Sequence, residues 1–136
     1  MPNPGFLDHL RALRGYGGQI VHVEHLPARE ARYGRLDHPL PAVLAHALDR
    51  RGLRGLYTHQ AQAVNAVRRG ESVVIATSTA SGKSLCYHLP VLEAIQADRG
   101  TRALYIFPTK ALAQDQMRSL RELLGEDMPY LRFDAF

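Results

Sequence analysis

The fold class of this chain can be inferred from one segment, Ala76-Thr77-Ser78-Thr79-Ala80-Ser81-Gly82-Lys83-Ser84. The residues before it, 72–76, form an apolar run without polar alternation, which is typical of a strand buried on both faces of a parallel sheet. The residues after it continue as an apolar helix from Lys83 to about Ala97. Because a turn of small residues lets backbone N–H groups converge at a helix N-terminus, the segment predicts a phosphate-binding loop.

The side chains of this loop fit the phosphates of a nucleotide and its metal ion. Lys83 would reach the β- and γ-phosphates, and the Ser84 hydroxyl would bind Mg²⁺. Thr77 stands where the usual pattern, G-x-x-x-x-G-K-[ST], has glycine, so the match is incomplete. The alternative is an ordinary turn of small residues with a solvated lysine. We expect Lys83 and Ser84 to be catalytic, and nucleotide contacts from Ser78, Thr79, Ala80, Ser81, Gly82, Lys83 and Ser84.

A second strand and a second helix follow the loop. Residues 102–107 form another apolar run, Pro108 and Thr109 turn the chain, and a helix with an apolar stripe then continues to Gly125. Residues 130–133 predict a third strand. Strands that alternate with helices predict an α/β fold, here part of a P-loop NTPase parallel sheet with flanking helices.

Upstream of this sheet, the sequence predicts helices and one further strand. A helix from Thr58, its predicted N-cap, ends at Gly70. Earlier segments predict a helix over residues 6–14, a strand over residues 20–26, and a helix over residues 40–50. We expect residues 1–55 to form an accessory N-terminal segment and residues 56–136 to form the first part of the nucleotide-binding domain.

Composition limits the class of protein. The chain has 136 residues, of which 46% are hydrophobic and 22% charged, as in an ordinary globular domain. Its apolar runs are far shorter than a membrane span, so we expect a cytoplasmic protein without membrane contact. The single cysteine, Cys86, excludes a disulfide framework. The net charge of +4 suits an anionic partner, although arginine at ordinary surface positions explains it equally well.

Three segments, in order, carry a resemblance to a known family. They are Leu56-Tyr57-Thr58-His59-Gln60, the phosphate loop, and Phe107-Pro108-Thr109-Lys110-Ala111-Leu112-Ala113-Gln114. Together they resemble the Q motif, motif I and motif Ia of superfamily-two DEAD/DEAH-box helicases. Ala80, where most members have glycine, is similar to the Hrq-type and mitomycin-repair (Mrf) branch, as are residues 20–32 and 76–116. The resemblance covers about residues 20–134 and implies the start of the first RecA-like domain, ahead of the DEAD/DEAH box.

The resemblance implies roles for the residues of these motifs. The Gln60 amide carries a donor and an acceptor, so it would bond the amino group and N7 of adenine and reject guanine, which makes ATP the expected nucleotide. Tyr57 would stack on the base, although a core aromatic is equally consistent with its position. Pro108, Thr109 and Lys110 would contact a phosphate of nucleic acid, with single-stranded DNA as the expected partner. Thr109 is also a natural helix N-cap.

The sequence after Lys110 lacks a catalytic acid pair. ATP hydrolysis in this class needs a Walker-B carboxylate beside a second acid after an aliphatic strand. The acids here do not follow that pattern: Asp115, Glu122, Glu126, Asp127 and Asp134. We therefore expect an N-terminal piece of an ATP-dependent DNA helicase, acting in DNA repair, that needs a second RecA-like domain and neither hydrolyses ATP nor unwinds by itself. The alternative is a non-catalytic nucleic-acid-binding module whose phosphate loop contacts the nucleic-acid backbone.

Overall fold

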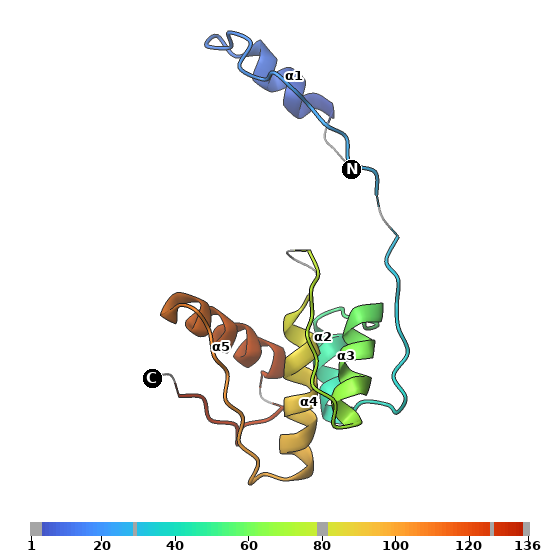
Figure 1. Ribbon diagram of the computed structural model, residues 1–136. Coiled ribbons are helices and arrows are strands. Elements are labelled where there is room, and N and C mark those ends of the chain that lie inside the picture. Colours follow the sequence, from blue (N-terminus) through green and yellow to red (C-terminus); the bar gives the residue numbers. More distant parts are fainter. Residues whose placement is uncertain (1–3, 29, 79–81, 126, 135–136) are drawn as a thin grey trace. The chain divides into compact units, whose positions relative to one another are not determined.

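The computed structural model describes residues 4–28, 30–78, 82–125 and 127–134. The chain divides into two units, Met1–Glu30 and Ala31–Phe136. Within the described residues the regular elements are helices (Figure 1): α1 (Pro4–Ala12), α2 (Ala42–Arg50), α3 (Thr58–Arg68), α4 (Ser84–Ala97) and α5 (Lys110–Leu124). Each helix lies where the apolar periodicity of the sequence predicts one.

The first unit contains α1 and a segment without regular structure. After α1, the Gln19 side chain closes a glycine-rich turn. Its Oε1 accepts the Gly17 N–H at 2.8 Å, and its Nε2 donates to the Gly15 carbonyl at 3.1 Å. The prediction of a strand over residues 20–26 is wrong, because the described residues there pair with no other segment and Val21 is 93% exposed. A β-prone segment without a partner strand has no ladder of hydrogen bonds to stabilise it.

The second unit is built around a core between α2, α3, α4 and α5. α3 packs against α4, and α2 contacts both α4 and α5 (Figure 1). Each of these helices turns its apolar stripe inward, which removes apolar surface from water. The core consists of Leu44, Leu48, Leu56, Ala61, Val64, Leu89, Leu92, Leu120, Leu123, Leu124 and Met128.

Three helix ends follow local sequence signals. Gly70 (φ +80°) and Gly125 (φ +54°) adopt positive φ after α3 and α5, a conformation that glycine reaches without strain. The Thr109 hydroxyl accepts the Leu112 N–H at 3.2 Å, which confirms Thr109 as the N-cap of α5.

The start of α3 differs from the prediction by one residue. Tyr57 is the N-cap and Thr58 is the first helical residue, so the prediction of Thr58 as the cap is wrong. The reason is a tertiary contact. The Thr58 hydroxyl and N–H both donate to the Arg32 carbonyl, at 3.1 and 2.9 Å, instead of the hydroxyl accepting a bond from the helix.

The strands predicted over residues 72–76, 102–107 and 130–133 do not pair with one another in the described part of the chain. Apolar side chains in the first two remain open to solvent, since Val74 is 96% exposed, Leu104 83% and Ile106 85%. Parallel strands are stable between neighbouring strands and under helices that cover both faces, and the described residues do not supply these partners. The parallel sheet therefore remains a prediction.

The residues just before α2 run along α3, and we call residues 31–39 the upstream strap. Tyr33 of this strap and Tyr57 form an antiparallel β-bridge. Gly34 approaches α3 so closely that a Cβ on it would lie 2.7 Å from the Ala61 Cβ. Only glycine permits this approach, so Gly34 brings the strap down onto the helix.

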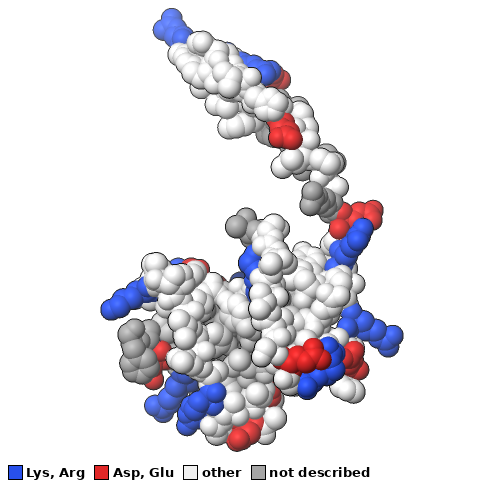
Figure 2. Space-filling model, in the orientation of Figure 1, with Lys and Arg blue, Asp and Glu red and all other residues white. Residues whose placement is uncertain are grey.

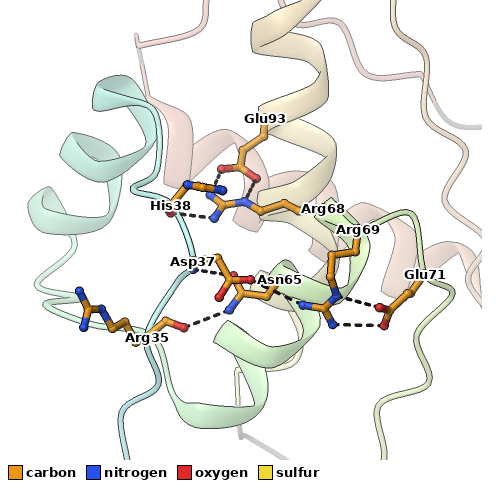
Figure 3. A network of polar contacts seen from close by, with 8 residues as sticks. All are labelled: Arg35, Asp37, His38, Asn65, Arg68, Arg69, Glu71 and Glu93. Atoms are coloured by element: carbon orange, nitrogen blue, oxygen red, sulfur yellow. Dashed lines mark hydrogen bonds and ion pairs between the residues drawn. The ribbon is translucent and has the colours of Figure 1, made fainter.

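A network of polar contacts centred on Arg68 joins the upstream strap to α3 and α4 (Figure 3). The Arg68 Nε and Nη2 donate to the Glu93 carboxylate at 3.0 and 2.5 Å, and the Arg68 Nη1 donates to the His38 carbonyl at 2.7 Å. The hydrogen bond to the Glu93 carboxylate is the main reason that the pKa of Arg68 lies above its ordinary value. One guanidinium thus connects three segments of the unit.

Asn65 of α3 adds a second set of bonds to the same network (Figure 3). Its side-chain amide donates to the Arg35 carbonyl at 3.0 Å and accepts the Asp37 N–H at 3.1 Å. The strap thus belongs to the same unit as α3. The functional division that we place at residue 55 stays a prediction.

Charged side chains of the second unit lie in separate groups on the face drawn in Figure 2, and acidic residues adjoin several of the basic ones. Arg50 illustrates one structural use of these charges. Its Nη1 binds Asp127 at 2.6 Å, and its Nη2 donates to the Leu123 and Leu124 carbonyls at 3.1 Å each, where the helix dipole favours a cation. The net positive charge therefore does not by itself indicate where nucleic acid binds.

Candidate nucleotide and nucleic-acid site

The predicted phosphate loop leads from residues 72–78 into α4, and Thr79, Ala80 and Ser81 lie outside the described residues. Lys83 is the N-cap of α4 and turns its ammonium back toward the start of the loop. Its Nζ lies 3.0 Å from the Thr77 carbonyl, 3.2 Å from the Thr77 Oγ1 and 2.5 Å from the Ser78 carbonyl. Thr77, the residue that departs from the usual glycine, thus supplies two of these oxygen atoms. Ser84 follows as the first residue of the helix.

Gly82 joins the loop to the Q-motif segment. Its φ is +73°, and a Cβ on it would lie 2.5 Å from the Gln60 Nε2. The Gln60 Nε2 donates to the Gly82 carbonyl at 2.8 Å, and its Oε1 accepts the Tyr57 N–H at 2.8 Å. Gln60 is only 2% exposed. Both ends of its amide are bonded inside the protein, so adenine recognition by Gln60 stays a prediction and requires that these bonds be exchanged.

An exposed stack of rings lies at the start of α3. The Tyr57 ring is 5.7 Å from the Tyr33 ring with an interplanar angle of 20°, and 6.0 Å from the His59 ring with an angle of 19°. Tyr33 is 63% exposed and Tyr57 40%. Tyr33 is not predicted from the sequence, because no motif includes it and the β-bridge to Tyr57 brings it here.

The residues predicted to contact nucleic acid lie at a second helix N-terminus. Pro108, Thr109 and Lys110 are all exposed, and Lys110 is the first residue of α5. A groove of about 810 Å³ opens beside them between α4, residues 101–107, α5 and residues 130–134. Exposed N–H groups, a hydroxyl and an ammonium at one helix start are suited to a phosphate oxygen.

A buried histidine lies on the inner wall of this groove, one turn into α4. His88 is 3% exposed, its Nδ1 lies 3.3 Å from the Tyr105 hydroxyl, and its Nε2 has no partner among the described residues. Burial lowers the pKa of His88 to about 4, although the nearby Gln116 amide opposes the shift. Burial also raises the pKa of Tyr105 to about 12, with a contribution from Tyr87. Both groups are therefore uncharged at neutral pH.

Folding stability should depend on the protonation of His88. The unfolded chain takes up this proton near pH 6.5 and the folded chain only near pH 4, so protons favour the unfolded state between these values. We expect the free energy of unfolding to fall by about 2 kcal/mol more in the wild type than in a His88→Gln variant when the pH drops from 8 to 5. Urea denaturation at the two pH values measures the difference. An equal loss in both proteins would contradict the assignment.

The described residues hold neither a metal-binding cluster nor a membrane-spanning helix. No three His, Cys, Asp or Glu side chains lie close enough together to bind a metal ion. Within the same residues, each helix is too short or too polar to span a membrane.

Comparisons with known proteins bear on this site. The family model for DEAD/DEAH box helicases matches residues 57–133. The ATP-dependent helicase YprA of Bacillus subtilis is 48% identical over 79% of this chain and 14% of its own length. The ATP-dependent helicase hrq1 of Schizosaccharomyces pombe is 43% identical over 96% of this chain and 13% of its own length.

A solved structure is similar as well. The DUF1998 helicase MrfA, crystallised with DNA and AMPPNP, superposes with a TM-score of 0.70 at 47% identity, over 79% of this chain and 15% of that one. The chain therefore spans about one seventh of the length of these relatives. The matches confirm the resemblance to the Hrq-type and Mrf branch that the motifs indicate. The chain belongs to the DEAD/DEAH box helicase family.

Proposed function

We propose that this chain is the ATP-binding N-terminal part of an ATP-dependent DNA helicase that acts in DNA repair, as the mitomycin-repair branch that it resembles does. The observation that carries the proposal is the position of Lys83, whose ammonium is held by oxygen atoms of Thr77 and Ser78 at the start of the predicted phosphate loop. Phosphate oxygens of ATP can replace these oxygen atoms at the α4 N-terminus, where the helix dipole already favours an anion.

The base end of the nucleotide would meet the start of α3. Tyr33 and Tyr57 are 63% and 40% exposed and stack on each other, so a purine would extend this stack, and Gln60 lies within hydrogen-bond reach of the Gly82 carbonyl. In this proposal the Gln60 amide leaves its internal partners to bond adenine. Nucleotide binding and the conformation of the loop are then linked through one side chain.

Magnesium would be held by the Ser84 hydroxyl together with phosphate oxygens and water, since Mg²⁺ in such sites takes few ligands from the protein. Ser84 is the first residue of α4 and half-buried, which suits this role. When bound, Mg²⁺ neutralises phosphate charge. Lys83 adds a second positive charge to the same oxygen atoms.

Nucleic acid would bind at the start of α5. Thr109 and Lys110 are exposed there, and MrfA, the similar solved structure, was crystallised with DNA. We propose that they bind a phosphate of single-stranded DNA and that nucleotide bound at Lys83 controls the affinity of this contact. A second RecA-like domain would complete the motor.

Hydrolysis would require acidic residues outside this chain. Three of the acids that follow Lys110 in the sequence form ion pairs with arginines. The distances are 2.6 Å for Asp127 and Arg50, 3.7 Å for Glu122 and Arg51, and 3.8 Å for Asp115 and Arg118. These carboxylates serve ion pairs of α5 and its surroundings. We therefore propose that the chain alone binds ATP but does not hydrolyse it.

A titration with a fluorescent ATP analogue, with and without Mg²⁺, tests the proposal. Saturable binding that ATP displaces at least about tenfold better than GTP supports an adenine-specific helicase site. Salt-sensitive binding of DNA without any nucleotide signal would instead support the non-catalytic nucleic-acid-binding module.

A Gln60→Ala variant should lose the preference for ATP over GTP. The lost hydrogen bonds are worth about 1–2 kcal/mol, so we expect ATP to bind about tenfold more weakly and the two nucleotides to compete almost equally. Competition titrations measure both effects. Gln62→Ala is the matched control, because Gln62 is an exposed glutamine on the same helix. A variant that still rejects GTP would show that Gln60 does not read the base.

A further inference from the structure

Four side chains from three separate segments meet beside the groove, and we call them the bridging cluster: Tyr87 and His88 from α4, Tyr105 from residues 101–107, and Gln116 from α5. The Tyr87 hydroxyl donates to the Gln116 Oε1 at 2.9 Å, and the Tyr105 hydroxyl lies 3.3 Å from the His88 Nδ1. The rings pack together, with centroids 4.6 Å apart for Tyr87 and His88 and 5.4 Å apart for His88 and Tyr105.

The cluster lies between the two predicted binding segments. Tyr87 is one helical turn from Lys83 along α4, so it belongs to the phosphate-loop end of that helix. On the other side, the Tyr105 ring stacks on the Phe107 ring, with centroids 6.2 Å apart and planes within 2°. Phe107 directly precedes Pro108 and Thr109. A continuous chain of contacts thus leads from the start of α4 to the start of α5.

One member of the cluster has an unmet hydrogen bond. The His88 Nε2 is buried and has no partner among the described residues, and leaving such an atom unpaired costs free energy. The Gln116 Oε1 accepts the Tyr87 hydroxyl, and Gln116 also acts on His88 from the same side of the cluster. Gln116 thus connects α5 to both cluster members that α4 supplies.

We propose that Tyr87, His88, Tyr105 and Gln116 are positioning residues that hold the Pro108–Lys110 turn in register with the phosphate-loop helix, so that ATP and DNA binding influence each other. None of the four touches nucleotide or DNA in this account, which rests on the proposed helicase function. A shift of α4 on nucleotide binding moves Tyr87 and His88, and these contacts pass the shift to the turn at the start of α5. By linkage, DNA bound at that turn must change the affinity for ATP by the same factor.

Tyr87→Phe and Tyr105→Phe test the proposal in the full-length helicase, because each removes one hydroxyl and leaves the ring. ATP hydrolysis is measured with and without single-stranded DNA, together with the KM for ATP and the DNA concentration that gives half-maximal stimulation. We expect the stimulation by DNA to fall at least about fivefold, with hydrolysis and KM in the absence of DNA unchanged. Gln116→Glu, which keeps an acceptor for Tyr87, should retain more stimulation than Gln116→Met.

Tyr130→Phe is the matched control. The Tyr130 hydroxyl also donates to a glutamine on α4, the Gln96 Oε1 at 2.8 Å, but it lies on an exposed surface outside the cluster. This variant should keep full stimulation, and thermal melting of every variant separates loss of fold from loss of coupling.

The outcomes distinguish this inference from the proposed function. A wild-type helicase that binds no ATP would overturn both. A wild type that DNA stimulates normally, with equal stimulation in Tyr87→Phe, Tyr105→Phe and Gln116→Met, would overturn the positioning role alone. So would an equal loss of stimulation in Tyr130→Phe.

Discussion

Replacement of Lys83 by alanine should lower the rate of DNA-stimulated ATP hydrolysis by the full-length helicase by about 10²–10³-fold, the usual loss when one charge-stabilising donor is removed. The Lys83 Nζ is held by the Thr77 and Ser78 carbonyls and the Thr77 hydroxyl, at the place where we expect the β- and γ-phosphates. Without the ammonium, the phosphate charge that develops during the reaction loses its nearest side-chain partner. Steady-state ATPase assays at saturating DNA measure the loss.

The other lysine of the chain, Lys110, offers an informative comparison. A Lys110→Ala variant should bind DNA more weakly, and the slope of log affinity against log salt should fall by about 1, as for the loss of one phosphate contact. Lys83→Ala should leave that slope unchanged. Hydrolysis of ATP by Lys83→Ala at the wild-type rate would contradict the assignment of the loop as an ATP site.

Replacement of Arg68 by alanine should lower the free energy of unfolding by about 3 kcal/mol. The side chains of Arg68 and Glu93 are only 19% and 15% exposed, and the guanidinium also donates to the His38 carbonyl (Figure 3) and to the Pro39 carbonyl. The variant leaves a carboxylate and two carbonyl groups without this partner, and an unpaired charge away from water is costly. Urea denaturation measures the effect.

Arg69→Ala is the control, because the neighbouring Arg69 side chain is 54% exposed and pairs with Glu71 and Asp37 at the surface. Exposed ion pairs contribute little to stability, so its melting temperature should stay close to that of the wild type. Equal destabilisation by both variants would show that the Arg68–Glu93 pair stabilises the unit no more than the exposed contacts of Arg69 do.

Several features of this chain could be predicted from neighbouring residues. The spacing of Leu44 and Leu48, and of Leu120 and Leu124, indicates which helix faces are buried, since residues about one helical turn apart share a face. The Thr109 cap can also be predicted from the sequence, because its hydrogen bond with the Leu112 N–H joins residues only three positions apart. The expected strands 72–76 and 102–107 depend on partners far along the chain, and the described residues do not provide them.

The sequence alone determines the order of the motifs, the five helices within the described residues and membership of the helicase family. Only the tertiary structure reveals that Gln60 binds the Gly82 carbonyl, that Tyr33 stacks on Tyr57, and that Tyr87 reaches Gln116. The physical reason is the separation of the partners. Helix periodicity and caps act within one or two turns, whereas these contacts join residues more than twenty positions apart, and packing of the strap, the loop and the helices decides which of them meet.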